Sequence, residues 1–104
     1  MNILHIDTSN NKEIIVGLET DGEKDTLTKQ SDAWKSQVVL PLIDELLKKH
    51  MLTVKDLDAI SVNEGPGSFT GLRVGATIAN TLGTLLKIPI NGKNVGELVE
   101  PKYQ

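Results

Sequence analysis

The chain of 104 residues contains no cysteine and only one tryptophan, one tyrosine and one phenylalanine. Without cysteine there is no thiol nucleophile, no disulfide and no thiolate metal site, so the fold has to be held by packing alone. The scarcity of aromatic rings predicts an aliphatic core. A chain of this length buries about 60–65% of its unfolded surface, so we expect one modest core.

The chain also lacks an excess of positive charge and any long apolar run. Eleven basic and fourteen acidic residues give a formal net charge of −3, the wrong sign for holding nucleic acid directly through its phosphates. If the protein acts on RNA, we therefore expect a partner protein to make the contact with the RNA. No stretch approaches the roughly eighteen apolar residues of a bilayer span, and the N-terminus has no basic, apolar leader. We expect a cytoplasmic domain without membrane contact.

What the chain does contain is a series of short β-rich runs and two stretches with helical periodicity. Asp21-Gly22 predicts a tight hairpin turn between the second and third β-rich runs. Pro41 predicts either a kink in the first helix or the point where its regular part begins. The β-rich runs cover residues 3–6, 14–18, 26–28, 58–62 and 88–90, and the helical stretches cover residues 33–50 and 68–86.

This order of elements predicts an α/β domain with a mixed five-stranded sheet. Two of the strands are each reached through a helix, so right-handed crossovers place them parallel to their neighbours. With the strands numbered along the chain, the expected sheet order is 3-2-1-4-5, with the charged third strand at the margin and the helices packed on the sheet. This is the ribonuclease-H-like, or actin-like, arrangement. Residues 1–92 would form the single domain, and residues 93–104 a short turn or helix and a tail.

A glycine-rich turn between the fourth strand and the second helix is the most informative stretch. Two glycines bracket a proline and allow close approach of the backbone, and Ser68 or Gly67 can cap the helix that follows. A helix N-terminus can bind an anion, but this turn lacks the lysine of a phosphate-binding loop and the third glycine of a dinucleotide fingerprint. The sequence is compatible with two interpretations of this stretch, a plain strand-to-helix turn and an anion-binding site. The residues of the turn are Gly65, Pro66, Gly67, Ser68, Phe69, Thr70, Gly71 and Arg73.

The same stretch resembles the signature of the bacterial TsaB family, the partner subunit in forming N6-threonylcarbamoyladenosine on transfer RNA. The resemblance covers most of residues 1–92 and departs from the family pattern at Lys35, where histidine is common, and at Asn80-Thr81, where Lys-Gly is usual. Family members carry a second domain of similar fold, which we expect to be absent here. The closing residues 100–104 resemble the ends of full-length members and indicate an internal deletion. The other similar segments are residues 3–9, 35–47, 57–60 and 88–90.

The resemblance implies an accessory subunit that performs no chemistry. In the family, the two helices meet the equivalent helices of the catalytic TsaD-type subunit, or those of a second copy in a homodimer when the protein is alone. The TsaD-type subunit transfers threonylcarbamoyl to adenosine 37 of transfer RNA, and a TsaE-type ATPase assists. We therefore expect a partner that activates the TsaD-type subunit and meets transfer RNA only through the complex. The resemblance implies no cofactor or metal bound by this chain itself. Whether a nucleotide binds at the partner interface is left open by the sequence.

Both predicted helices have more apolar surface than one core requires. The first has a core stripe of Val39, Leu40, Ile43, Leu46 and Leu47, and the second has small residues at every fourth position, which let another element approach closely. The alternative is that the two helices only pack on each other and on one face of the sheet. The predicted partner interface consists of Trp34, Val38 and Leu42 on the first helix and Gly71, Gly75, Ala79 and Gly83 on the second.

A pair of carboxylates supports a hypothesis from a different class, a small metal-dependent nuclease or nucleotide-binding enzyme. Asp7 and Glu64 follow adjacent parallel strands, so both are expected at the same edge of the sheet, where nucleases of this fold keep their metal-binding acids. A two-metal site usually gathers three or four carboxylates, and only two are available here. His5 and His50 lack the helical spacing of a zinc site and are assigned to core packing and helix capping.

Overall fold

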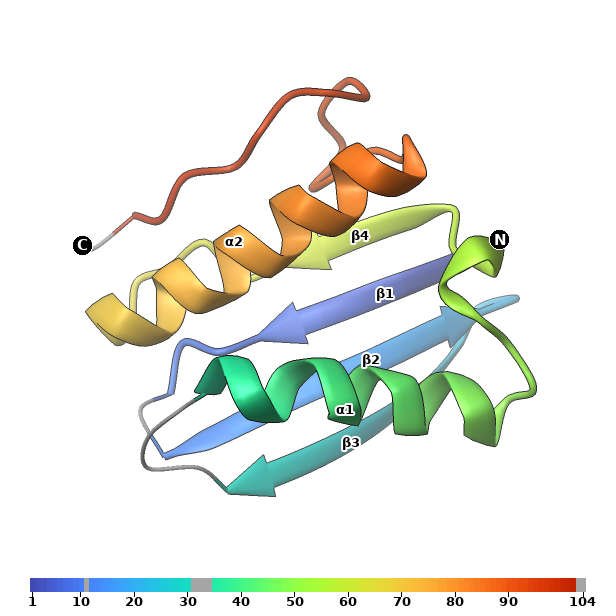
Figure 1. The fold of residues 1–104 in the computed structure, drawn as a ribbon, viewed down its shortest axis with the longest axis horizontal. Helices are drawn as coiled ribbons and strands as arrows, with labels where there is room; N and C mark the ends of the chain where they lie inside the picture. The colour runs from blue at the N-terminus through green and yellow to red at the C-terminus, as the bar shows by residue number, and fades with distance from the viewer. Residues whose placement is uncertain (11, 31–34, 103–104) are drawn as a thin grey trace.

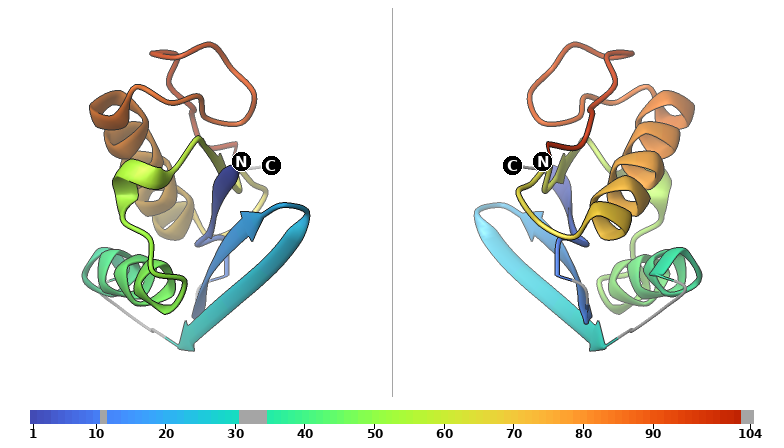
Figure 2. Two further views of the ribbon diagram at one scale, coloured as in Figure 1. Left: turned by 90° about the vertical axis from the view of Figure 1, so that its right-hand side faces the viewer. Right: turned by 90° about the vertical axis from the view of Figure 1, so that its left-hand side faces the viewer.

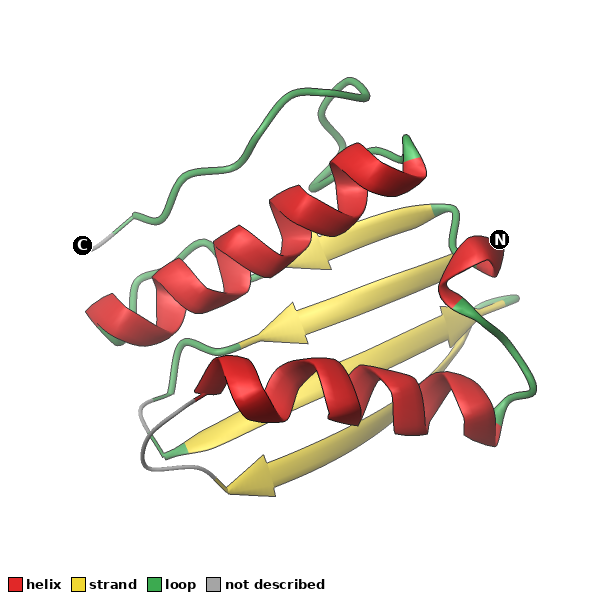
Figure 3. Cartoon of the chain, in the orientation of Figure 1, coloured by secondary structure: helices red, strands yellow, loops and turns green. Residues whose placement is uncertain are grey.

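Within the residues that the structure describes, two long helices lie on one face of a four-stranded mixed sheet (Figure 1, Figure 2). The computed structural model describes residues 1–10, 12–30 and 35–102. Figure 3 distinguishes the elements by type. In chain order they are β1 (Asn2–Asp7), β2 (Glu13–Thr20), β3 (Glu23–Gln30), α1 (Lys35–Lys49), a short 3-10 helix (Val54–Asp56), β4 (Ala59–Val62) and α2 (Phe69–Leu86).

The predicted strand connections are confirmed for the first four strands. The sheet order is β3-β2-β1-β4, with β1 antiparallel to β2 and parallel to β4. The turn between β2 and β3 places Asp21 at φ 52° and Gly22 at φ 84°, the left-handed pair that a tight hairpin requires. β3 pairs with β2 and lies at the margin of the sheet, as its charged sequence predicts.

The predicted fifth strand is wrong, because in the described part of the chain pairing beyond β4 is reduced to a single parallel bridge between Ile60 and Ile90. Around this bridge, the Ile60 N–H donates to the Pro89 carbonyl at 3.0 Å and the Asn91 N–H donates to the Ile60 carbonyl at 2.9 Å. Asn91 then turns the chain away with φ 51°. The side-chain amide of Asn91 makes the hydrogen bonds that a continued fifth strand would have made to Val62. It accepts from the Val62 N–H at 2.8 Å and donates to the Val62 carbonyl at 3.0 Å.

The helices start and end for local reasons. Ser68 caps α2, because its hydroxyl oxygen accepts a hydrogen bond from the Gly71 N–H at 3.2 Å. At the other end Lys87 adopts the left-handed conformation and its N–H bonds to the Gly83 carbonyl. Pro41 is exposed and lies inside α1. Because the helix already begins at Lys35, the proline does not mark where its regular part begins.

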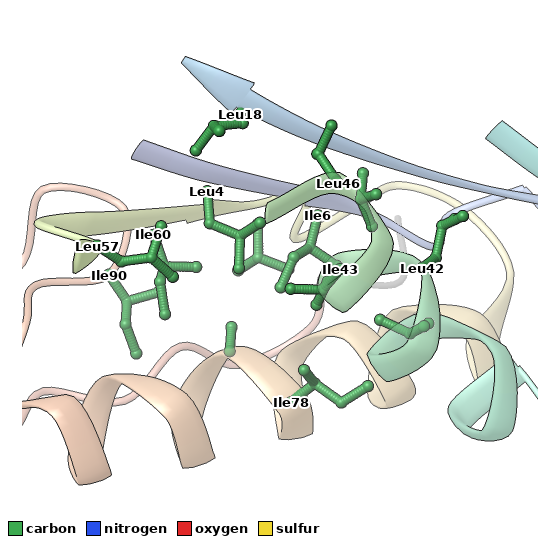
Figure 4. Packing of buried hydrophobic residues seen from close by; sticks show 14 of the residues in the cluster. Leu4, Ile6, Leu18, Leu42, Ile43, Leu46, Leu57, Ile60, Ile78 and Ile90 are labelled. Atoms are coloured by element: carbon green, nitrogen blue, oxygen red, sulfur yellow. The ribbon is translucent and has the colours of Figure 1, made fainter. Parts of the chain in front are cut away.

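The core is aliphatic, as predicted, and lies between the sheet and the two helices (Figure 4). The stripe assigned to the first helix needs one correction: Leu40 is 50% exposed, and Leu42 is buried at 5% exposure in its place. A helical wheel gives the angles between side chains but not the direction of the sheet. Because the core also reaches toward α2, it takes in Leu42 and leaves Leu40 outside.

Candidate functional site

The glycine-rich turn is packed between two other segments of the chain. Gly65 has φ +123°, and a Cβ at this position would overlap the carbonyl oxygen of Lys102. A Cβ on Gly67 would lie 2.6 Å from the Cβ of Ser9. The Ser68 N–H donates to the Ser9 carbonyl at 2.7 Å, which ties the start of α2 to the loop after β1. These contacts favour the reading of a tight strand-to-helix turn, since each glycine is explained by packing.

The small residues of α2 face the protein's own sheet, so their assignment to a partner interface has to be corrected. A Cβ on Gly75 would overlap the Thr8 hydroxyl, and one on Gly83 would lie 2.5 Å from Cδ1 of Ile90. The Thr8 hydroxyl also donates to the Gly71 carbonyl at 2.5 Å, and Ala79 is fully buried. The stripe therefore lets α2 approach β1 and β4 closely.

The predicted interface stripe on α1 is only partly at the surface. Leu42 lies in the core, where it is 5% exposed, and Val38 is half-buried against the core. Trp34 lies outside the described residues. Leu42 therefore cannot form an outer surface, and of the two described members of this stripe Val38 is the one that a partner can reach.

A shallow groove on the outer surface of α2 was missed by the sequence reasoning. The signal was present as a narrow strip of Arg73 and threonines on an otherwise apolar helix. The Arg73 guanidinium lies 5.4 Å from the centre of the Phe69 ring, within range of a cation–π contact. We call this surface, together with Val38, the outer helix face. The groove is lined by Thr70, Arg73, Val74, Thr77 and Ile78.

Asp7 sits at the end of β1, where several hydrogen bonds hold its carboxylate. One oxygen, Oδ1, accepts from the Ser9 hydroxyl at 2.6 Å, the Ser9 N–H at 3.0 Å and the Asn63 amide at 3.3 Å. Burial by itself raises the pKa of Asp7. The hydrogen bonds from Ser9 and Asn63, with the charge of Lys24, outweigh burial and leave the pKa below its usual value of 3.8. Ser9 in the loop after β1, Asn63 after β4 and the charge of Lys24 together therefore favour the carboxylate form of Asp7.

Glu64 is held by a different part of the chain. Its carboxylate oxygen Oε2 accepts a hydrogen bond from the Asn91 amide at 2.7 Å, and its backbone carbonyl accepts one from the Lys102 N–H at 2.6 Å. Asp7 lines a hollow with Asn63 on the sheet, whereas Glu64 lines one with Asn91 and the C-terminal segment. The structure therefore does not bring the two carboxylates into one acid pair. Among the described residues, no group of three or more histidine, aspartate or glutamate side chains is placed to hold a metal ion.

The two histidines have roles other than those assigned from the sequence. His5 is half-buried on the sheet face opposite the helices, where its Nε2 lies 3.0 Å from Oε1 of Glu19. His50 follows α1 and contacts Asp25 of β3 at 2.8 Å, next to a Lys49–Asp25 ion pair at 2.9 Å. The second cluster connects the end of α1 to the edge strand, and the Lys49 and His50 hydrogen bonds lower the pKa of Asp25.

With this geometry established, comparisons with known proteins define the class. The family model for TsaD, tRNA N6-adenosine threonylcarbamoyltransferase, matches residues 31–97. The solved structure of YeaZ from Pseudomonas aeruginosa superposes with a TM-score of 0.80 at 28% identity, covering 86% of this chain and 43% of that one. The fold is therefore that of a YeaZ-like α/β domain.

Two curated relatives narrow the assignment. The tRNA threonylcarbamoyladenosine biosynthesis protein TsaB of Haemophilus influenzae is 37% identical over 90 residues, which cover 86% of this chain and 38% of the relative. TsaB of Bacillus subtilis is 36% identical over 117 positions, which cover 99% of this chain and 50% of the relative. The chain belongs to the family of the matching model and is a TsaB/YeaZ-like member of it. It spans half or less of the length of these two relatives.

No helix among residues 1–10, 12–30 and 35–102 has both the length and the apolar character that crossing a lipid bilayer requires.

Proposed function

We propose that this chain acts in the formation of N6-threonylcarbamoyladenosine on transfer RNA as a non-catalytic partner that binds and activates a TsaD-type transferase. The names of the TsaB relatives support the process, and the TsaD family model supports the kind of partner. The observation that carries the binding mode is the outer helix face, where exposed and half-buried residues of α2 line a shallow groove.

The chemistry of the outer helix face suits another helical surface. Val74 and Val38 are half-buried and packed against the core, so they offer apolar contact without leaving it. On α2, Thr77 and Arg73 are exposed and line the groove with Val74, where they supply polar contacts at the rim. An apolar centre with a polar rim is the usual composition of a binding patch between proteins. Helices of a partner laid along α1 and α2 would bury this patch.

The carboxylates support the accessory role over the nuclease alternative. That alternative requires Asp7 and Glu64 to share a metal or nucleotide site. Asp7 is instead bound by Ser9 and Asn63, and Glu64 by Asn91. On our proposal the chain changes the activity of its partner through a coupling free energy, for which about 1–3 kcal/mol is typical.

The test compares two threonine-to-arginine variants at exposed positions. Thr77→Arg places a long charged side chain in the groove on α2, and Thr28→Arg makes the same change on the edge strand β3. Each variant is mixed with the TsaD-type subunit from the same organism and analysed by size-exclusion chromatography with light scattering. We expect wild type and Thr28→Arg to form the mixed complex and to raise the rate of threonylcarbamoyl transfer.

Thr77→Arg should lose both the complex and the activation while keeping a wild-type circular dichroism spectrum, since arginine is a good helix former. If the protein alone forms a homodimer through the same face, Thr77→Arg should also shift it to monomer. A Thr77→Arg protein that still binds the transferase as wild type does would show that the outer helix face is not the docking site.

A further inference from the structure

The chain turns sharply at Asn91 and Gly92, directly after the isolated bridge to β4. Asn91 has φ 51° and Gly92 has φ 73°. The turn is closed by the Lys93 N–H, which donates to the Ile90 carbonyl at 3.0 Å. Two successive residues with positive φ form the kind of tight turn for which Asn-Gly is a favoured sequence. The backbone geometry therefore explains why this dipeptide stands here.

The same dipeptide is chemically reactive, because an asparagine side chain can be attacked by the main-chain nitrogen of the next residue. Glycine has no Cβ to hinder the approach. In this step the Gly92 nitrogen forms a bond to Cγ of Asn91 and gives up its proton, while the Cγ–Nδ2 bond breaks and Nδ2 leaves as ammonia. Water then opens the cyclic imide at either of its carbonyls and gives aspartate or isoaspartate. The reaction consumes water and no other reagent.

Solvent reaches the reacting groups in the folded protein. Gly92 is exposed, and a Cβ built on it would meet nothing within 4 Å. Asn91 is half-buried. Access of water is therefore available, and the position of the Asn91 amide decides whether the attack can occur.

The fold ties both ends of the Asn91 amide to β4 and the residues after it. The amide oxygen accepts from the Val62 N–H at 2.8 Å, and Nδ2 donates to the Val62 carbonyl at 3.0 Å and to Oε2 of Glu64 at 2.7 Å. The attack requires the amide to turn toward the Gly92 nitrogen and Nδ2 to leave, and both steps break these hydrogen bonds. A local opening that lifts the turn away from β4 would release the amide.

We propose that Asn91-Gly92 is a deamidation site that the folded protein protects, and that reaction there makes a transient opening of the turn permanent. The product has a carboxylate in place of the amide. This carboxylate can still accept from the Val62 N–H, but it has no hydrogen to donate to the Val62 carbonyl or to Glu64. Two carboxylates then meet where Nδ2 now lies 2.7 Å from Oε2 of Glu64, and like charges this close repel each other.

The charges around this corner of the molecule are balanced before the reaction. The hollow beside Asn91 is lined by two acids and two lysines, Glu64, Glu100, Lys93 and Lys102, so conversion of Asn91 leaves one negative charge in excess. The C-terminal segment is attached at the same place, because the Lys102 N–H donates to the Glu64 carbonyl at 2.6 Å. We therefore expect the reaction to loosen both the edge of β4 and the C-terminal segment. This proposal does not depend on the outer helix face.

The experiment follows the reaction in the whole 104-residue protein. Wild type is incubated at neutral pH in buffer and in concentrated guanidinium chloride, beside a synthetic peptide of residues 88–93. Trypsin cleaves after Lys87 and Lys93, so the same peptide is released from the protein, and its aspartyl and isoaspartyl forms are separated by chromatography and identified by mass spectrometry. We expect the free peptide and the denatured protein to react at similar rates. The folded protein should react about tenfold more slowly or less, since only its open fraction is reactive.

A matched pair of variants tests the contact with Glu64. Glu64→Ala removes an acceptor of the Asn91 amide, whereas Glu64→Gln keeps one in its side-chain carbonyl. Glu64→Ala should speed the reaction in the folded protein by about tenfold, the factor expected for the loss of a hydrogen bond to a charged group. Glu64→Gln should speed it much less. Both variants should react as wild type does in guanidinium chloride, and circular dichroism checks that both are folded in buffer.

A second set of variants tests the consequence of the reaction. Asn91→Asp reproduces the aspartyl product, and we expect a lower urea midpoint and faster amide hydrogen exchange at Lys102. Asn94→Asp adds the same charge at an exposed position and should leave both quantities unchanged. Combining Asn91→Asp with Glu64→Gln should recover part of the lost stability, because the glutamine amide can donate to the new carboxylate.

Three results would overturn the proposal. The first is a folded wild type that reacts as fast as the free peptide, or a free peptide that does not react. The second is a folded Glu64→Ala protein that reacts no faster than wild type. The third is an Asn91→Asp protein with the urea midpoint and the Lys102 exchange rate of wild type, which would show that the reaction leaves the fold unchanged.

Discussion

The two faces of the sheet are built from the same strands yet differ in what they do. The helix-covered face buries Leu4, Ile6 and Val16 at 2% exposure or less. One residue along in β1, the open face presents Ile3 and His5, which are only half-buried. The comparison teaches that alternation along a strand sends one set of side chains into the core and leaves the other set near the surface. One side of each strand holds the fold together, and the other side stays at the surface of the described residues.

The largest expected effect separates the inner from the outer side of α2. Gly75→Arg should prevent folding or destabilise the protein by more than about 4 kcal/mol, because even a Cβ there overlaps the Thr8 hydroxyl. Thr77→Arg, two residues along and exposed, should change the free energy of unfolding by no more than about 0.5 kcal/mol. Urea denaturation followed by circular dichroism measures both. Equal effects of the two variants would contradict the orientation of α2.

The next effect compares neighbours on opposite faces of β1. Leu4→Ala should cost about 3 kcal/mol, because the side chain is fully buried and its removal leaves a cavity. Ile3→Ala should cost about 1 kcal/mol or less in the protein alone, since the side chain already meets solvent. If Ile3→Ala is as destabilising as Leu4→Ala, the open face is covered in solution by something that the described chain does not contain.

A smaller effect concerns the segment that returns along α2 toward the glycine-rich turn (Figure 1). The Asn80 amide donates to the Val99 carbonyl at 3.0 Å and accepts from the Val99 N–H at 2.9 Å. Asn80→Ala removes both bonds and should cost about 1–2 kcal/mol. It should also speed amide hydrogen exchange at Val99. Thr81→Ala, at the exposed neighbouring position, is the control and should leave that exchange rate unchanged.

The smallest effect is a pH dependence at Asp7. Hydrogen bonds and the Lys24 charge hold its pKa below the usual value of 3.8 in the folded protein. A depressed carboxylate pKa contributes stability that is present above the unfolded pKa and is lost as the pH falls through the folded one. The stability difference between wild type and Asp7→Asn should therefore be constant near neutrality and shrink below about pH 4. Urea midpoints measured from pH 7 to pH 3 test this, and a difference independent of pH would contradict it.

Much of the architecture follows from local chemistry. The hairpin at Asp21-Gly22, the cap at Ser68 and the charged edge of β3 each depend on neighbouring residues, so the sequence was enough to predict them. The fifth strand could not be predicted in the same way. Whether Ile90 continues the ladder depends on Asn91, whose side chain satisfies the Val62 backbone 29 positions earlier.

The candidate site shows the same division. The glycines at positions 75 and 83 predict that α2 packs closely against another element. The pattern does not say whether that element belongs to a partner or to the protein's own sheet. The structure places both against the sheet, at Thr8 and Ile90. The placement of Asp7 and Glu64 at one edge was a sound topological inference. Side-chain hydrogen bonds nevertheless turn the two carboxylates toward different segments.

The sequence by itself therefore determined the order of the first four strands and the two long helices, the turns and caps, the aliphatic character of the core and the family. These depend on periodicity and on contacts a few residues apart. Only the tertiary structure decided which stripe of each helix is inside, where the sheet ends and which surfaces stay open. Those outcomes depend on the relative positions of segments far apart in the chain, such as Asn80 with Val99 and Gly75 with Thr8.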